Sequence, residues 1–173
     1  LGSVASSESP VLPSGYELGV DFVNKQLLLV KSAGATSPYT TWSAGKNLAA
    51  GVNDGATQDP DGDGNSNLLE FALGGNPLAS DATIMPVETL TAENLIFTFN
   101  RSDASEQEVA LGFQSSSDLT TWTEVAIGAT SAGSVVVVEN GAEPDTVTIT
   151  LPRSNEAGGK LFGRLKAALN TDQ

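Results

Sequence analysis

The sequence predicts a mainly β protein in which a β-sandwich is preceded by a β-hairpin and a short helix–loop–helix segment. Three observations lead to this fold class. From residue 86 onward, short runs of alternating apolar and polar residues are separated by turn-forming residues, as in a sandwich. An aspartate- and glycine-rich loop at residues 59–70 lies between two short helical patterns. Two apolar runs, one on each side of Asn24-Lys25, predict the hairpin.

Length and composition limit both the organisation and the chemistry of the chain. Its 173 residues can hold one medium domain or two small ones. We divide them into an arm and hairpin (1–36), a helix–loop–helix segment (37–80) and a sandwich (81–173). The net charge of −13 excludes a nucleic-acid binder that relies on a basic patch, and no stretch approaches the ~20 apolar residues of a membrane span. The chain has no cysteine and no histidine, so a cysteine nucleophile and the commonest general base are both missing.

The N-terminal region combines an extended arm with a hairpin. Residues 1–15 are rich in serine, proline and glycine, and are expected to form the arm. In the first strand Tyr16, Leu18 and Val20 alternate with more polar residues, whereas the run at 27–30 is apolar on both faces. A strand of the second kind needs cover on both sides, which an isolated hairpin cannot supply. We therefore expect self-association through these N-terminal strands, with folding back onto the chain's own sandwich as the alternative.

The helix–loop–helix segment is bounded by recognisable signals. Ser37 can cap an entering helix that starts at Pro38, with Tyr39, Trp42 and Ala49 sharing roughly one face. An exit helix is expected from about residue 67 to 73, where a glycine pair ends it. We expect Trp42 to pack against Leu68 or Phe71, and an aromatic platform for a ligand is the functional alternative.

The loop between the two helices has the ligand spacing of an EF-hand calcium loop. Ca²⁺ takes six to eight oxygen ligands, and alternate residues of a tightly curled loop can direct their oxygens inward. Gly64 falls at position 6, where the sharp turn requires glycine. The predicted ligands occupy positions 1, 3, 5, 7 (by its main-chain carbonyl), 9 and 12: Asp59, Asp61, Asp63, Asn65, Asn67 and Glu70.

The alternative for this loop is a turn that binds nothing, but aspartates this crowded would repel one another without a cation. Ser66 stands at position 8, where paired EF-hands carry an apolar residue, and the sequence contains no second complete loop. The fragment at residues 53–55 is expected to be a plain turn. The sequence therefore predicts a solitary calcium loop of the dockerin or thrombospondin type, which usually works at the millimolar calcium found outside cells.

The C-terminal half carries the sandwich pattern. The run of four valines at residues 135–138 is apolar on both faces and is expected to be covered on both. The segment at 160–169 fits either a helix or a strand, and Gly163 favours a strand. The strands are expected at residues 94–101, 108–115, 122–126, 134–139, 146–151 and 160–169.

Several of these motifs together resemble the C-terminal region of large secreted bacterial surface proteins. The resemblance covers most of residues 15–169, and the calcium loop is its only specific motif. In that group an EF-hand-, dockerin- or thrombospondin-type-3-like calcium loop precedes a fibronectin-III-like sandwich, and residues 15–31 look like the closing hairpin of an autotransporter-like β-solenoid. The runs that carry the resemblance are Tyr39-Thr40-Thr41-Trp42, DPDGDGNSNLLEFALGGNP from Asp59, Phe97-Thr98-Phe99-Asn100-Arg101, Ser117-Asp118-Leu119-Thr120-Thr121-Trp122 and Phe162-Gly163-Arg164-Leu165.

The resemblance implies an extracellular location and adhesion, glycan handling or surface architecture, but no single activity. We expect a non-enzymatic, calcium-stabilised structural protein: a self-assembling surface or filament subunit, or the C-terminal part of a surface or adhesion protein. The alternative is a calcium-dependent, glycan-binding accessory module of a secreted polysaccharide-degrading enzyme. Such a module usually needs exposed aromatic residues, which make up only 6% of this chain.

Overall fold

The structure is a computed structural model that describes residues 16–21, 24–31, 36–128, 130–141 and 144–170. The chain divides after Ser37 into two compact units. In the N-terminal unit, β1 (Tyr16–Asp21) and β2 (Gln26–Lys31) pair in antiparallel register and confirm the predicted hairpin. The predictions for the arm at 1–15 and for the apolar side chains at 27–30 lie outside what the structure describes.

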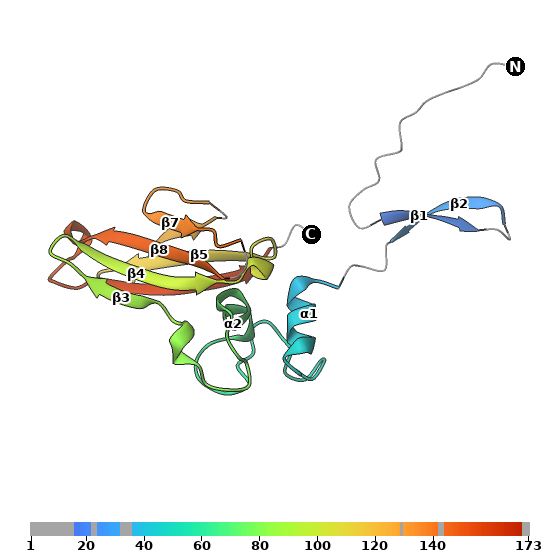
Figure 1. Ribbon diagram of the computed structural model, residues 1–173, viewed down its shortest axis with the longest axis horizontal. Coiled ribbons are helices and arrows are strands. Elements are labelled where there is room, and N and C mark those ends of the chain that lie inside the picture. Colours follow the sequence, from blue (N-terminus) through green and yellow to red (C-terminus); the bar gives the residue numbers. More distant parts are fainter. Residues whose placement is uncertain (1–15, 22–23, 32–35, 129, 142–143, 171–173) are drawn as a thin grey trace, which may run out of the picture. The chain divides into compact units, whose positions relative to one another are not determined.

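The C-terminal unit is built mainly from two antiparallel sheets, which agrees with the predicted sandwich (Figure 1). One sheet has the strand order β3-β4-β8-β7 and the other has the order β6-β5-β9. Inward-facing residues alternate with outward-facing ones along β4 and β8, the central strands of the larger sheet. The strands are β3 (Val87–Leu90), β4 (Asn94–Arg101), β5 (Val109–Ser116), β6 (Thr123–Ile127), β7 (Val135–Val138), β8 (Asp145–Pro152) and β9 (Phe162–Leu169).

Two details of the strand prediction were wrong. β3 was not predicted, because its two apolar residues, Val87 and Leu90, fall on opposite faces and give no alternating signal. The valine run in β7 was expected to be covered on both faces. Instead, Val135 is 2% exposed while Val136 and Val138 are 48% and 52% exposed. β7 is an edge strand, and among the described residues only its inward face meets the core.

Two short helices complete the unit: α1 (Pro38–Gly45) and α2 (Asn67–Leu73). The helical pattern was expected to reach Ala49, but α1 stops at Gly45 and Asn47 takes a positive φ of 62°. Trp42 packs against Phe71 with ring centroids 5.5 Å apart, as predicted, and both rings contact Tyr39.

The helices and the sandwich share one hydrophobic core. Phe71 of α2 belongs to the same buried cluster as Phe97 and Phe113 of the facing sheets. Main-chain contacts add to this packing, because the Ser102 N–H donates to the carbonyl oxygen of Ala72 at 2.9 Å. The predicted calcium segment and the predicted sandwich are therefore packed as a single body within residues 38–172.

Gly163 interrupts the apolar pattern of β9 because a larger residue would not fit at this position. A Cβ atom at this position would lie 2.9 Å from Cζ of Phe97 and closer still to the ring of Phe113. These two rings meet with centroids 4.8 Å apart, so neither has room to move away. The glycine allows the strand to approach the aromatic pair at the centre of the sandwich.

We expect Gly163→Ala to lower the free energy of unfolding by about 1–3 kcal/mol, the usual cost of overpacking a filled core. Urea denaturation followed by tryptophan fluorescence measures this loss. Gly112→Ala is the control, because a Cβ atom there would meet only the flexible side chain of Glu124. If both variants were equally stable, the close approach at Gly163 would not constrain the fold.

Candidate metal centre

The predicted calcium loop curls back on itself at two glycines and leads directly into α2. Gly62 and Gly64 have φ angles of 75° and 94°, a conformation that side chains with a Cβ rarely adopt. Ser66 caps α2, with its Oγ accepting from the Leu69 N–H at 3.4 Å. The helix ends at Gly74, which has a φ of 80°. The predicted helix limits and the predicted role of Gly64 are both met.

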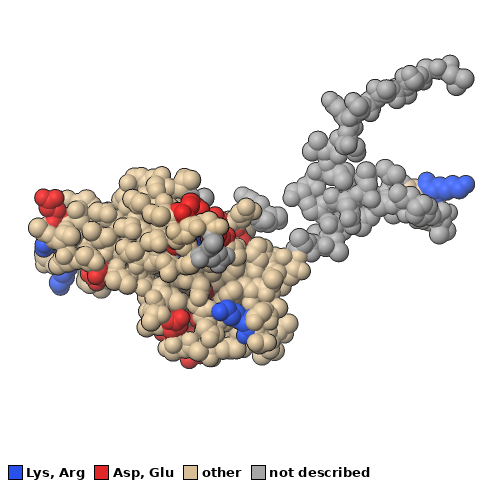
Figure 2. All heavy atoms as spheres, viewed as in Figure 1, with Lys and Arg blue, Asp and Glu red and all other residues tan. Residues whose placement is uncertain are grey.

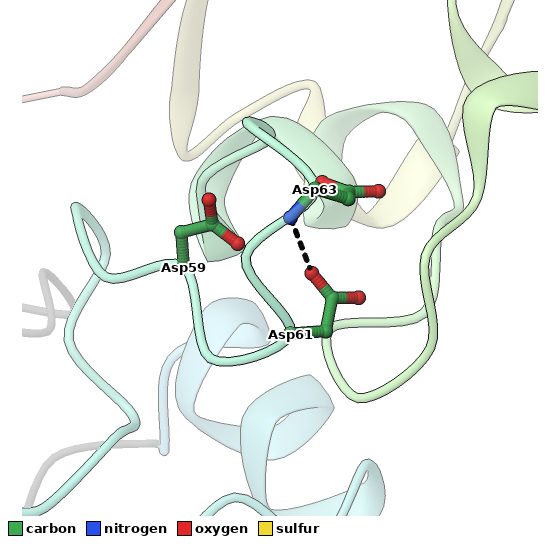
Figure 3. A group of neighbouring side chains, drawn as sticks. All are labelled: Asp59, Asp61 and Asp63. Carbon is green, nitrogen blue, oxygen red and sulfur yellow. Dashed lines mark hydrogen bonds between the residues drawn. The ribbon is translucent and has the colours of Figure 1, made fainter.

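The curled loop brings the first three predicted ligands together. Carboxylate oxygens of Asp59, Asp61 and Asp63 lie within 4.8 Å of one another (Figure 3). Loop N–H groups hold these side chains in place. Asp59 accepts from Gly62 and Gly64 at 2.9 Å each, and Asp61 accepts from the Asp63 N–H at 3.1 Å. The main chain of the loop thereby holds the side chains of Asp59 and Asp61 in place.

The two predicted ligands on α2 lie entirely inside the protein. Asn67 and Glu70 are each 0% exposed. The side-chain N–H groups of Asn67 donate to the carbonyl oxygens of Asn53 and Gly55 at 2.9 Å, which leaves its Oδ1 without a partner. Both carboxylate oxygens of Glu70 and Oδ2 of Asp61 are also buried and lack any hydrogen bond within the described part of the chain.

Buried oxygens of this kind normally have a donor or a cation, because an unpaired buried carboxylate is costly. Burial raises the pKa of Glu70 to about 7, and the charges of Asp61, Asp63 and Asp59 add to the effect. The loop therefore concentrates more negative charge than its own residues neutralise. A divalent cation among these oxygens would supply both the missing charge and the missing partners.

The sixth predicted ligand, Asn65, is linked to Asp63 by hydrogen bonding. Asn65 is buried, and its N–H donates to Oδ1 of Asp63 at 2.8 Å. Oδ2 of Asp63 also accepts from the Asp81 N–H at 2.9 Å. These two N–H groups hold the pKa of Asp63 below its ordinary value. Asp63 is thus kept ionised, although both of its oxygens already accept hydrogen bonds.

The donor set fits calcium. Every predicted ligand atom is a carboxylate, amide or carbonyl oxygen, which is the ligand type that hard cations prefer. No thiolate sulfur or imidazole nitrogen is available, since the chain has neither cysteine nor histidine. Among the described residues, six buried side-chain atoms lack a hydrogen-bond partner, and four of them belong to Asp61, Asn67 and Glu70, at positions 3, 9 and 12 of the loop. The other two are Nε of Arg101 and Oδ1 of Asp103, outside the loop.

Sequence reasoning missed the groups that support this site from outside the loop. A plain turn was expected at residues 53–55, whereas the turn lies at residues 50–53. The carbonyl oxygens of Asn53 and Gly55 orient the Asn67 amide, and the carbonyl oxygen of Gln58 accepts the Asn67 N–H at 2.8 Å. Asp81 contributes its main-chain N–H. All of these groups belong to the main chain, so the residue types in the sequence do not reveal them.

A second acidic group surrounds Arg101 at the end of β4. Arg101 contacts Glu106, lies 2.8 Å from Oδ2 of Asp145 and 3.6 Å from Oε1 of Glu139. Both Arg101 and Asp145 are buried. The guanidinium of Arg101 contacts all three acids and balances part of their charge, so we interpret this group as an ion-pair cluster rather than a second metal centre.

Comparisons with protein-family models, curated proteins and solved structures give no match to this chain. Within the residues that the structure describes, no helix combines the length and the apolar character needed to cross a membrane. The function is therefore inferred from the geometry of the loop and of the sandwich around it.

Proposed function

We propose that this chain is a non-enzymatic, calcium-stabilised extracellular structural protein. It acts as a self-assembling surface or filament subunit, or as the C-terminal part of a surface or adhesion protein. The observation that carries the proposal is the set of buried, unpartnered oxygens of Asp61, Asn67 and Glu70 beside two further loop aspartates. A calcium ion there would be coordinated by Asp59, Asp61, Asp63, Asn67, Glu70 and the main-chain carbonyl of Asn65.

The place of this loop in the fold supports a structural role for the ion. Residues of α2 that follow the loop, such as Phe71, lie in the common core, and Asp63 is joined to Asp81 ahead of β3. Calcium would therefore stabilise the junction between α2 and the sandwich. Ligation from several positions of one loop restrains the main chain there, so binding and folding stability are linked.

No constellation among the described residues argues for catalysis. The clustered acids are assigned either to the loop or to Arg101, and a Ser/His/Asp arrangement is impossible without histidine. The tryptophans do not favour the glycan-binding alternative. Trp42 packs against Tyr39 and Phe71, and the guanidinium of Arg164 lies 3.8 Å from the centroid of Trp122. Neither indole offers an unobstructed platform for a sugar ring.

Self-assembly is assigned to β1 and β2. These strands pair only with each other among the described residues, and an isolated two-stranded hairpin is marginally stable in water. The sequence of β2 also contains an apolar run, and contact with a further strand or sheet would remove those residues from water. Addition of these strands to a neighbouring subunit would provide it.

The proposal predicts calcium-dependent assembly. Calorimetric titration should detect one Ca²⁺ per chain with a Kd of about 10⁻⁴–10⁻³ M, and tenfold excess over Kd should stabilise the fold by about 1.4 kcal/mol. Negative-stain microscopy of the full chain should show filaments or arrays with calcium and fewer with a chelator. Deletion of residues 1–31 should prevent assembly while leaving a soluble, folded chain.

The same measurements can refute the proposal. Titration without any calcium binding to the folded chain would remove its basis. A stable monomer at high concentration with calcium would disprove self-assembly, and monodisperse particles that bind a polysaccharide array would favour the glycan module.

A further inference from the structure

The outward face of the four-stranded sheet is uncharged in the described residues. Cross-strand partners share a face, so the pairing register assigns its members without ambiguity. The outward positions, which we call the threonine–valine face, are Val87, Thr89, Asn94, Ile96, Thr98, Asn100, Val136, Val138, Thr146, Thr148, Thr150 and Pro152. Figure 2 shows the surface over the middle of β4 and β8 largely in tan, with acidic atoms toward the ends of the strands.

The outward face of the other sheet is different. There Glu124 accepts from Gln114 at 2.7 Å and from Lys166 at 3.3 Å, and Arg164 donates to Gln114 at 2.7 Å. This ionic network is the kind of surface expected to stay in water. The contrast between the two faces sets the threonine–valine face apart on a chain whose net charge is −13.

One row of side chains crosses all four strands of the threonine–valine face. It runs Val136–Thr148–Thr98–Val87, with apolar residues at the ends and a threonine pair in the middle whose Oγ1 atoms lie 3.5 Å apart. Val87 and Val136 are 66% and 48% exposed. β-branched side chains have few rotamers, so little conformational entropy is lost when they are packed against a partner.

We propose that the threonine–valine face packs against the same face of a second copy of this chain. Copies that each carry a charge of −13 repel one another wherever acidic surfaces meet, and this face lets them approach without burying a charge. A partner rich in charge of either sign would find no complementary group here. The second copy supplies an uncharged surface of matching chemistry, with hydroxyls that can bond to each other in a two-fold arrangement.

The size of the face predicts a weak dimer. Two strands of eight residues and two of four, spaced about 4.8 Å apart with a rise of about 3.3 Å per residue, give a contact of roughly 400 Å² per copy. Stable specific interfaces bury about 800 Å² per partner, so this contact belongs to the weak, reversible class. Combined with the separate contact proposed for β1 and β2, it would give each chain two kinds of self-contact and allow assembly in more than one direction.

The absence of cysteine makes the proposal directly testable in the full chain, because a single introduced thiol can be modified without background. Thr148→Cys places the thiol at the centre of the face, and Ala126→Cys places it on the exposed outward side of β6 as the control. A bismaleimide that spans about 10 Å, the usual spacing of packed sheets, should yield several-fold more covalent dimer from the first variant.

A second substitution tests the contact itself. Thr98→Glu in the Thr148→Cys chain should abolish the covalent dimer, because two like charges would then meet across the two-fold axis, whereas Thr98→Val should preserve it. Equal yields from the thiols at 148 and 126, or a yield unchanged by Thr98→Glu, would overturn the proposal. Residues 98 and 148 lie outside β1 and β2, so the effect of Thr98→Glu on the covalent dimer is measured separately from assembly through those strands.

Discussion

Glu70→Gln should weaken calcium binding by about one to two orders of magnitude. Glu70 is the only predicted ligand that can offer two carboxylate oxygens from a fully buried position, and neither oxygen has another partner among the described residues. The amide keeps the shape of the side chain but removes its charge and one of its oxygens. Since affinity in such loops depends on the number of charged ligands, calorimetric titration should record the loss directly.

Two further variants give this prediction its specificity. Glu93→Gln removes the same charge at an exposed turn and should leave the Kd unchanged. Asn67→Ala should weaken binding less than Glu70→Gln, because it removes one neutral oxygen. If Glu70→Gln bound calcium like the unmodified chain, the buried carboxylate would not be a ligand and the metal assignment would fail.

The loop was predictable from the sequence because its geometry depends on residue types at fixed spacings. Alternate acidic residues, a glycine at the sharp turn and a glutamate on the following helix are visible without coordinates. The spacing of the ligands does not predict their burial or their hydrogen-bond partners, which the structure shows. Glu70 and Asn67 are entirely buried, and the carbonyl oxygens of Asn53 and Gly55 fix the orientation of the Asn67 amide.

The sandwich was predictable where a strand has one buried and one exposed face. β4 was predicted with its observed limits, and Leu95, Phe97 and Phe99 are buried as their alternation suggested. Edge strands were less predictable, because their burial depends on neighbours that are distant in the sequence. Thus β3 was missed, and the valines of β7 gave no indication that Val136 would be exposed.

The sharing of one core by α2 and the sandwich was also not visible in the sequence. The two segments differ in composition and are joined by a proline-containing connection. These features suggested two successive units. Their contact arises from the aromatic cluster of Tyr39, Trp42 and Phe71, which packs at one end of the sheets. This arrangement is why calcium, bound far from the sheets in sequence, is expected to stabilise the sandwich.

Arg101→Ala should be strongly destabilising, with a loss of about 3–5 kcal/mol in the free energy of unfolding. Arg101 joins β4 to its cross-strand partner Asp145 on β8, and its Nη1 donates to the carbonyl oxygen of Gly128 at 2.7 Å. Removal of the guanidinium would leave the carboxylate of Asp145 buried and unpaired. Urea denaturation at neutral pH measures the loss, and Arg153→Ala, which breaks a partly exposed pair with Glu156, should cost only about 0–1 kcal/mol.

The loss should also depend on pH in a defined direction. The hydrogen bond from Arg101 holds the pKa of Asp145 below its ordinary value, so the stability that this pair contributes is fully present above the unfolded pKa of about 3.9. It disappears as the pH falls through the lower folded value of Asp145. Burial raises the pKa of the neighbouring Glu106, so that acid takes up its proton earlier in the same fall in pH. The difference between the unmodified chain and Arg101→Ala should therefore be constant from about pH 6 to 8 and shrink in acid. A difference that grew as the pH fell would mean that another group controls the stability of this cluster.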